Sequence, residues 1–366
     1  MKKFKWAILG SGMAARKFVL GLRASSTSVA TAVASRSYEN AKRFGESLGI
    51  ATIHGSYADA IQDGAVDGFY IATPPTTHRD YALRCLETGK AVLIEKPFTT
   101  NAEEAGDIVA LARQRNVFCM EAMWTRFMPL LRQVKTLVDS GELGEIRMIS
   151  GSFGLAEIPD PANPLFNPAL GGGAMLDRAV YPISLTQHLL GSPRAVTADA
   201  IVGSTGVDEQ TAAILRYDSG ALAVLYASLT TQAPNELTIM GSDAVLQLLP
   251  PVFRPFRMRL TRIHPRPYQP SPWSHLAPLR ESHWIHQAMQ RVGSLVIPWV
   301  QRGTRTITVP YTGNGYHHEA DEVVRCVSAG RLESAVMPLD DSIAVMKTLD
   351  SIRTQCLQGH SDPTAE

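Results

Sequence analysis

Residues 6–15 read Trp-Ala-Ile-Leu-Gly-Ser-Gly-Met-Ala-Ala, and this stretch decides the fold of the chain. Its four leading apolar residues predict a strand buried on both faces, and a helical stretch follows from Arg16. Gly10 allows a tight turn, Gly12 lets a diphosphate approach bare backbone, and the small Ala15 lets the helix pack closely on the strand. An anion would bind the unpaired N–H groups at the helix N-terminus. The stretch therefore predicts a dinucleotide-binding turn, with a strand-to-helix turn that binds nothing as the alternative.

A second predicted strand, 29–34, indicates which dinucleotide suits the turn. It runs into Ser35 and Arg36, about 20 residues beyond the turn, where an acidic residue would bind the ribose hydroxyls of NAD. Neither residue is acidic. A hydroxyl and a guanidinium suit a 2′-phosphate, because arginine offers a planar pair of donors to phosphate oxygens. We therefore expect NADP as the cofactor, with NAD bound more weakly; the alternative is that Arg36 only begins a solvated helix.

The composition is that of an ordinary globular protein with two domains. At 366 residues the chain is long for one core, and 45% of its residues are hydrophobic. A net charge of +1 favours neither nucleic acid nor an anionic membrane as a partner. No apolar run approaches the roughly 18 residues of a membrane span, and no export signal is indicated. The four cysteines lack metal-site spacing, so we expect no metal and a cytoplasmic location.

Strands and helices alternate over residues 1–122. We expect further strands at 51–53, 68–73, 91–95 and 117–120, and helices at 38–48, 57–62, 81–87 and 101–115. The last of these helices opens with the capping box Asn101-x-x-Glu104. Such alternation predicts a parallel sheet covered on both faces, with ligands at the carboxyl ends of its strands. The fold class is therefore α/β, with an N-terminal Rossmann dinucleotide-binding domain.

Two of these strand ends carry unusual residues. The segment 73–75, Thr-Pro-Pro, is a stiff turn that can shape one wall of a nicotinamide pocket, and Thr77 is expected to cap the next helix. A rigid connector with His78 at the surface is the alternative. The segment 95–97, Glu-Lys-Pro, places Lys96 at the end of a buried strand, where a solvated surface charge is not expected. We expect its ammonium to face the cleft.

Several stretches together resemble one known family, the Gfo/Idh/MocA group of glucose-fructose oxidoreductase, inositol dehydrogenase and rhizopine-catabolism proteins. They are residues 7–15, 35–36, 73–78, 95–97, 121–129 (Glu-Ala-Met-Trp-Thr-Arg-Phe-Met-Pro) and 171–182 (Gly-Gly-Gly-Ala-Met-Leu-Asp-Arg-Ala-Val-Tyr-Pro). The resemblance spans residues 1–249 and thins beyond them. Within the family, the chain is most similar to dimeric dihydrodiol dehydrogenases and NADP-dependent xylose dehydrogenases.

The resemblance implies that residues 123–366 form an α/β substrate-binding and oligomerisation domain with an open, largely antiparallel sheet. The sequence agrees, because it predicts strands joined by short turns, as in a meander, at 147–153, 195–202, 211–217, 222–229, 236–240 and 244–249. A long helix is expected at 174–190. Its Asp177 and Tyr181 are spaced i, i+4, which places them on one face.

Residues 250–306 depart from the family as an insert rich in proline, arginine and tryptophan. Basic residues interleaved with aromatics can indicate single-stranded nucleic acid or a membrane surface. We favour a strand at 257–262 and a lobe in which the run 279–300 buries its apolar face against another subunit or domain. A strand at 306–310 and helices at 317–328 and 340–355 are expected after it, with His317 at a solvated helix start.

The resemblance also implies which residues form the site. Lys96 and Tyr181 are the catalytic candidates, with Asp177 orienting one of them. We expect the Lys96 ammonium to lower the pKa of Tyr181, so that Tyr181 transfers the proton and Lys96 binds the substrate oxygen; the alternative is that Tyr181 is a packed aromatic. The expected cofactor-binding residues are Gly10, Ser11, Gly12, Met13, Ala14, Ser35, Arg36, Thr73, Pro74, Pro75, His78, Glu95, Lys96, Pro97, Trp124 and Arg126.

These expectations combine into one function. The chain is interpreted as an NADP-dependent oxidoreductase that transfers a hydride between nicotinamide and a secondary alcohol or hemiacetal of a sugar or a trans-dihydrodiol, as a homodimer or homotetramer. Arg178 and Ala179 depart from the family, and an extra guanidinium would favour a more polar or acidic substrate. The alternatives are an anhydro- or deoxy-sugar ketone reductase and a non-catalytic cofactor-sensing regulatory protein.

Overall fold

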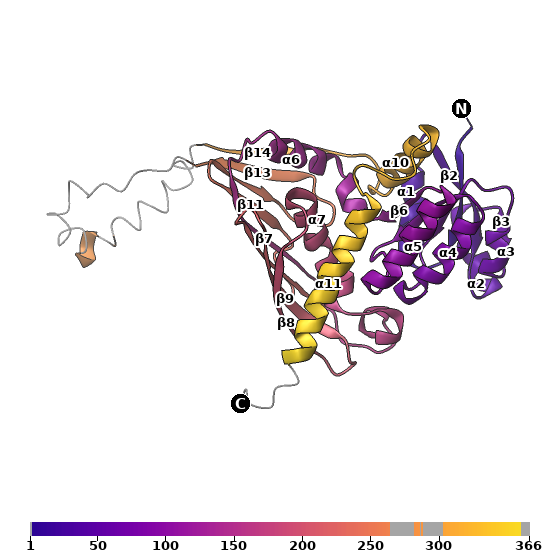
Figure 1. Cartoon of the computed structure of the whole chain (residues 1–366), viewed down its shortest axis with the longest axis horizontal. Helices are drawn as coiled ribbons and strands as arrows, with labels where there is room; N and C mark the ends of the chain where they lie inside the picture. Colours follow the sequence, from indigo (N-terminus) through magenta and orange to yellow (C-terminus); the bar gives the residue numbers. More distant parts are fainter. Residues whose placement is uncertain (1, 264–281, 286, 288–302, 360–366) are drawn as a thin grey trace.

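The computed structural model describes residues 2–263, 282–285, 287 and 303–359. Its described part contains two β-sheets, each covered by helices, and the C-terminal helix α11 (Leu339–Gly359) lies between them (Figure 1). This helix contacts α5 (Ala102–Arg115) beside the first sheet and β8 (Ala195–Val202) in the second. Because the end of the chain packs on both sheets, the division at residue 122 stays a prediction. Of the helices described, none is long and apolar enough to span a membrane.

The first sheet has six parallel strands in the order β3-β2-β1-β4-β5-β6, which confirms the predicted Rossmann arrangement. Its strands are β1 (Phe4–Leu9), β2 (Ser28–Ala34), β3 (Thr52–His54), β4 (Gly68–Ile71), β5 (Ala91–Glu95) and β6 (Cys119–Ala122). Its helices are α1 (Met13–Leu22), α2 (Tyr38–Leu48), α3 (Tyr57–Ile61), α4 (His78–Glu87) and α5. Since the strands are parallel, the residues that follow β1, β2, β4 and β5 meet at one edge of the sheet.

The helix ends follow the expected capping chemistry with two differences. Ser37 accepts a hydrogen bond from the Asn40 N–H at the start of α2, as its position predicts. Asn101 likewise caps α5, but the Glu104 carboxylate accepts from Thr100 rather than from the Asn101 N–H. Thr77 is the N-cap residue of α4, as predicted, but its hydroxyl donates to the Pro74 carbonyl and makes no capping hydrogen bond to the helix.

The second sheet has eight strands in the order β14-β13-β12-β11-β7-β10-β9-β8 and is mostly antiparallel, as expected. The strands besides β8 are β7 (Ile146–Gly154), β9 (Asp208–Arg216), β10 (Leu222–Ser228), β11 (Leu237–Gly241), β12 (Ala244–Leu248), β13 (Arg257–Arg262) and β14 (Thr304–Thr308). The predicted meander is confirmed for β8–β10 and for β11–β14, whose consecutive strands pair antiparallel. It was wrong for β7, which lies between β10 and β11 and pairs with β10 in parallel. After β7 the chain passes through a helical segment to β8, which lies at one edge of the sheet. β9 and β10 then follow in order toward β7, so β10 becomes the neighbour of β7.

Helices α6 (Pro129–Asp139), α7 (Val180–Leu190) and α11 cover one face of the second sheet (Figure 1). The predicted helix 174–190 is not one regular helix, since Met175–Ala179 forms a π-helical turn before α7 begins. Asp177 and Tyr181 still lie on one side of this helical segment, as predicted, because both contact the Lys96 ammonium.

Helix α10 (His317–Ser328) packs against α1 and the first sheet. His317 and Glu319 are both buried, so the expectation of a solvated helix start was wrong. In the predicted insert, β13 matches its expected range. The apolar run 279–300 lies outside the described residues except for 282–285 and 287, where Trp284 is exposed.

Candidate active site

The turn after β1 fits a diphosphate. Gly10 has a φ of +124°, and a Cβ added there would lie 2.3 Å from the Ala72 carbonyl oxygen, so glycine is required. A Cβ on Gly12 would meet no heavy atom within 4 Å, which leaves the backbone on that side open. Gly12 is also the N-cap of α1 and offers no capping side chain. The N–H groups of the first helical turn therefore remain available to an anion.

A cavity of about 640 Å³ runs from this turn along the carboxyl edge of the first sheet. The predicted residues that line it are Gly10, Ser11, Gly12, Met13, Ala14, Ser35, Arg36, Thr73, Pro74, Pro75, Glu95, Lys96, Pro97 and Asp177. Sequence reasoning missed the other lining residues Ser37, Asn40, Tyr57, Ala72, Pro164, Leu165, Leu170, Gly171 and Gly172. Those from 164–172 lie in a segment rich in proline, asparagine and glycine, and this turn-forming composition was the available signal.

The end of the cavity beside β2 carries no carboxylate. Ser35 is buried, and its hydroxyl accepts a hydrogen bond from the Ser11 hydroxyl at 3.2 Å. Arg36 is exposed to the cavity. The carboxylates among the described lining residues are Glu95 and Asp177, and strands β1 and β4 lie between the strand of Glu95 and β2. A negatively charged group beside Arg36 would therefore meet a cation, and no carboxylate of the cavity lining lies at this end.

Lys96 forms the polar centre of the cavity wall. Its Nζ donates to Asp177 Oδ1 at 2.7 Å and to the Asp177 main-chain oxygen at 2.9 Å, and it lies 4.9 Å from the centroid of the Tyr181 ring. Burial by itself lowers the pKa of Lys96, but the charge of Asp177 and its hydrogen bond to the ammonium raise this pKa above its ordinary value. Lys96 is therefore an ammonium at neutral pH.

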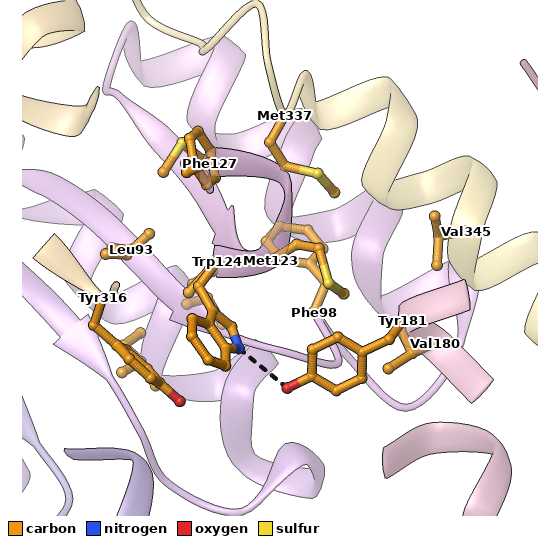
Figure 2. Packing of buried hydrophobic residues seen from close by; sticks show 14 of the residues in the cluster. Leu93, Phe98, Met123, Trp124, Phe127, Val180, Tyr181, Tyr316, Met337 and Val345 are labelled. Atoms are coloured by element: carbon orange, nitrogen blue, oxygen red, sulfur yellow. Dashed lines mark hydrogen bonds between the residues drawn. The ribbon is translucent and has the colours of Figure 1, made fainter. Parts of the chain in front are cut away.

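Tyr181 lies behind Lys96 rather than in the cavity lining. Figure 2 shows the Trp124 indole N–H donating to its hydroxyl oxygen at 3.2 Å. Burial raises the pKa of Tyr181 to about 12, and the opposing effect of Lys96 is smaller. The expectation that Lys96 lowers this pKa below that of a free phenol was wrong. Removal from water destabilises the phenolate more than the Lys96 ammonium, which is already paired with Asp177, stabilises it.

An aromatic cluster surrounds this tyrosine. Tyr316 stacks on Trp124 with ring centroids 4.5 Å apart, as the pair of rings in Figure 2 shows. Phe253 stacks on Phe153 at 5.1 Å, and Phe153 meets the Tyr181 ring edge-to-face at 5.3 Å. Sequence reasoning missed Tyr316 and Phe253, since both follow residue 249, where the resemblance becomes thin.

His78 and Arg126 support the site from outside the cavity. The ring nitrogens of buried His78 lie 2.9 Å from the Thr73 carbonyl oxygen and 3.0 Å from that of Pro97, so this side chain ties the two predicted strand-end turns together. Buried Arg126 donates to Ser184 Oγ at 2.9 Å and pairs with Asp341 at 2.6 Å. The structure therefore gives both residues structural partners instead of the cofactor contact that the sequence led us to expect, and Trp124 is likewise outside the lining.

Arg178 is buried and does not reach into the cavity as a free charge. Its guanidinium donates to the carbonyl oxygens of Leu155 and Ser228 and to the Glu157 carboxylate. The expectation that this arginine favours an acidic substrate was wrong, because these internal acceptors already use its donors. Ala179 is buried beside it.

Comparison with known proteins agrees with this geometry. Residues 4–123 match a family model described as an oxidoreductase family with an NAD-binding Rossmann fold, and residues 131–247 match the GFO/IDH/MocA C-terminal domain. The chain is 30% identical over 367 aligned residues to the trans-1,2-dihydrobenzene-1,2-diol dehydrogenase of Xenopus laevis, covering 96% of this chain and 97% of that enzyme.

Solved structures show the same fold. The 3-ketoreductase KijD10 from Actinomadura kijaniata, in complex with NADP and TDP-benzene, is 25% identical with a TM-score of 0.78, over 97% of this chain and 98% of that one. Levoglucosan dehydrogenase, in complex with NADH and levoglucosan, is 18% identical with a TM-score of 0.80, over 98% of each chain. The predicted resemblance is therefore confirmed, and this chain is an oxidoreductase of the GFO/IDH/MocA family.

Proposed function

We propose that this protein is an NADP-dependent oxidoreductase acting on a secondary alcohol or hemiacetal of a sugar or a trans-dihydrodiol, or on the corresponding ketone. The observation that carries the proposal is the Lys96 ammonium, held by Asp177 and lying over Tyr181, in the wall of a cavity that begins at a dinucleotide turn. When bound, the nicotinamide supplies or accepts the hydride. The side chains around it must then stabilise charge on the substrate oxygen and move one proton.

Lys96 and Tyr181 divide these two tasks. An indole N–H only donates, so Trp124 occupies an oxygen lone pair of Tyr181 and leaves the phenolic O–H free to donate to a substrate oxygen. The Lys96 ammonium stabilises negative charge on that same oxygen. Since both groups hold their protons at neutral pH, the site is prepared to reduce a carbonyl, and the alcohol-oxidising direction becomes easier as the pH rises.

The surroundings of the site favour a neutral cyclic substrate. The aromatic rings of Trp124, Phe153, Phe253 and Tyr316 pack around Tyr181 behind the cavity wall. This side of the site is therefore apolar, and burying a charged group there would be costly. Arg178 is already paired and adds no free positive charge for an acidic substrate. The names of the relatives, a dihydrodiol dehydrogenase, a levoglucosan dehydrogenase and a 3-ketoreductase, support a diol, a sugar or a ketone as the substrate.

Arg36 is the residue proposed to select NADP. The shared fold does not decide the cofactor, because one similar structure was solved with NADP and another with NADH. Arg36→Ala should weaken NADP binding by about 10- to 100-fold and change NAD binding little, since a charge-assisted contact to phosphate contributes about 1.5–3 kcal/mol. The dissociation constants of both cofactors are measured for both proteins, with Arg23→Ala, at the far end of α1, as the control.

The same proteins test the activity. A panel of aldoses, anhydrosugars and trans-dihydrodiols, with the matching ketones, is assayed with NADP(H) and NAD(H) by absorbance of the reduced cofactor. We expect turnover with at least one cyclic alcohol or ketone, faster with the NADP form, and loss of that preference in Arg36→Ala. NADP binding without turnover on any member would favour the cofactor-sensing alternative. Equal losses for both cofactors in Arg36→Ala would contradict the assignment of Arg36.

The open face of the second sheet is the proposed subunit interface. Met148, Ile201, Ile214 and Tyr226 project from β7, β8, β9 and β10 on the face opposite the helices, and each is 37–57% exposed. Figure 1 shows α7 and α11 on the other side of the sheet. An apolar surface of this kind favours association, and an isologous dimer could bury it.

Charges placed on this face should separate the subunits. The protein is expected to sediment as a multiple of its 39.8 kDa chain mass, and the double variant Ile214→Glu, Tyr226→Glu as a monomer. Leu20→Glu, on the exposed side of α1, serves as the control and should sediment like the parent. A monomeric parent, or a double variant that keeps the parental mass, would exclude this face as the interface.

A further inference from the structure

Arg178 lies at the centre of a buried hydrogen-bond network. Its side chain is 2% exposed. Nη1 donates to the Leu155 carbonyl oxygen at 2.5 Å and to that of Ser228 at 2.6 Å, and Nη2 donates to Glu157 Oε1 at 2.8 Å. The guanidinium therefore joins the ends of β7 and β10 to the π-helical turn that carries it.

The network reaches the reaction centre through Asp177. Arg178 Nε lies 3.7 Å from Asp177 Oδ2, and Asp177 Oδ1 accepts from Lys96 Nζ at 2.7 Å. The carboxylate thus lies between two cations, each beside a different oxygen. If Arg178 moved, Asp177 would lose one of the contacts that fix its orientation toward Lys96.

The network also reaches the cofactor side of the cavity. Glu157 Oε2 accepts from Asn163 Nδ2 at 3.3 Å, and Asn163 Oδ1 accepts from the Leu165 N–H at 3.1 Å. Leu165 lines the cavity together with Gly171 and other residues of the same segment. A continuous path of polar contacts therefore runs from Lys96 to the wall formed by residues 155–172.

We propose that Arg178 and Glu157 are positioning residues that hold this wall and the Asp177–Lys96 pair in one arrangement. The proposal rests on the oxidoreductase function proposed above. An arginine suits this task because its planar guanidinium meets several acceptors in fixed directions, whereas the single ammonium of a lysine cannot span them. Breaking the contacts of Arg178 or Glu157 should then loosen both the cofactor wall and Lys96.

The test uses Arg178→Lys, Glu157→Gln and the double variant, with two measurements that need no turnover. The dissociation constant of NADP is obtained from quenching of tryptophan fluorescence, and the rate of Lys96 modification by an amine-reactive reagent from peptide mass spectrometry. Burial lowers the pKa of Lys96 and Asp177 raises it, so a loosened Asp177 leaves more neutral amine, which is the reactive form. Because neither measurement depends on a substrate, failure of the proposed reaction would not be mistaken for failure of this network.

Each single variant should weaken NADP binding by about tenfold and speed Lys96 modification several-fold, because small displacements of a positioned group have large effects. The double variant should be no worse than the stronger single variant, as expected for residues that act as a unit. Arg113→Lys is the matched control, since Arg113 also bridges two carboxylates, Glu333 and Asp340, at the far end of α5. It should change neither measurement.

Parental Lys96 reactivity in both single variants, or additive losses in the double variant, would overturn the proposal. A change in NADP affinity without any change at Lys96 would also overturn it, because the two ends of the network would then be independent. The side chain of Glu157 is 36% exposed, so Glu157→Gln is expected to fold. This variant still tests the proposal if Arg178→Lys fails to fold.

Discussion

Replacement of Lys96 by methionine should lower kcat by about 1,000-fold, the largest effect expected of any single change in this chain. Methionine keeps the length and the apolar stem but removes the ammonium that stabilises charge on the substrate oxygen. It also leaves Asp177 without the donor that it now has at 2.7 Å. Steady-state turnover is measured with the best substrate of the panel, and the NADP dissociation constant should change by less than about threefold, because the effect lies in the transition state.

Lys135→Met is the control for this change. Lys135 also pairs with an aspartate, Asp139, but on the exposed face of α6, away from the cavity. Its loss should leave turnover at the parental level, because exposed pairs contribute little. Turnover of Lys96→Met within about tenfold of the parent would remove Lys96 from the catalytic role.

Tyr181→Phe should lower carbonyl-reducing turnover by about 100-fold or more and leave NADP affinity nearly unchanged. The change keeps the ring, its packing on Phe153 and the cation–π contact with Lys96, and it removes only the hydroxyl. Loss of this hydroxyl also leaves the Trp124 indole N–H without its acceptor, so unfolding temperatures are recorded beside the kinetics.

The pH dependence gives a second measurement on Tyr181. Because burial raises the pKa of this phenol to about 12, it keeps its proton throughout the range from pH 6 to pH 10. The reduction rate of the parent should therefore show no loss from Tyr181 in this range, while the oxidation rate should still be rising at pH 10. An oxidation rate that levels off near neutral pH would show that another group takes the proton.

Tyr217→Phe is the matched control, since Tyr217 is a buried tyrosine whose hydroxyl has no hydrogen-bond partner within the described structure. Its burial also raises its pKa above the ordinary value. Removing this hydroxyl should leave turnover unchanged. Equal kinetics for Tyr181→Phe and the parent would show that Tyr181 serves only as a packed aromatic.

The sequence by itself determined the features that depend on residues close together in the chain. The buried strand before Gly10 and the bare backbone at Gly12 predict the dinucleotide turn, because turn conformation is a local property. The position of Arg36 after β2 and of Lys96 after β5 follows from the strand-helix alternation, since parallel strands bring their carboxyl ends to one edge. These residues indeed line one cavity.

Only the tertiary structure decided how the catalytic candidates meet. Lys96 and Asp177 are 81 residues apart, and Trp124 and Tyr181 are 57 apart, so no local pattern gives their distances. The pKa of Tyr181 depends mainly on its burial by chain segments that are distant in the sequence. This burial raises the pKa more than the charge of Lys96, which the sequence could identify, lowers it. The partners of Arg178 likewise come from distant strand ends and a loop. Because its guanidinium is buried among these acceptors, Arg178 makes structural contacts where the sequence led us to expect contact with a substrate.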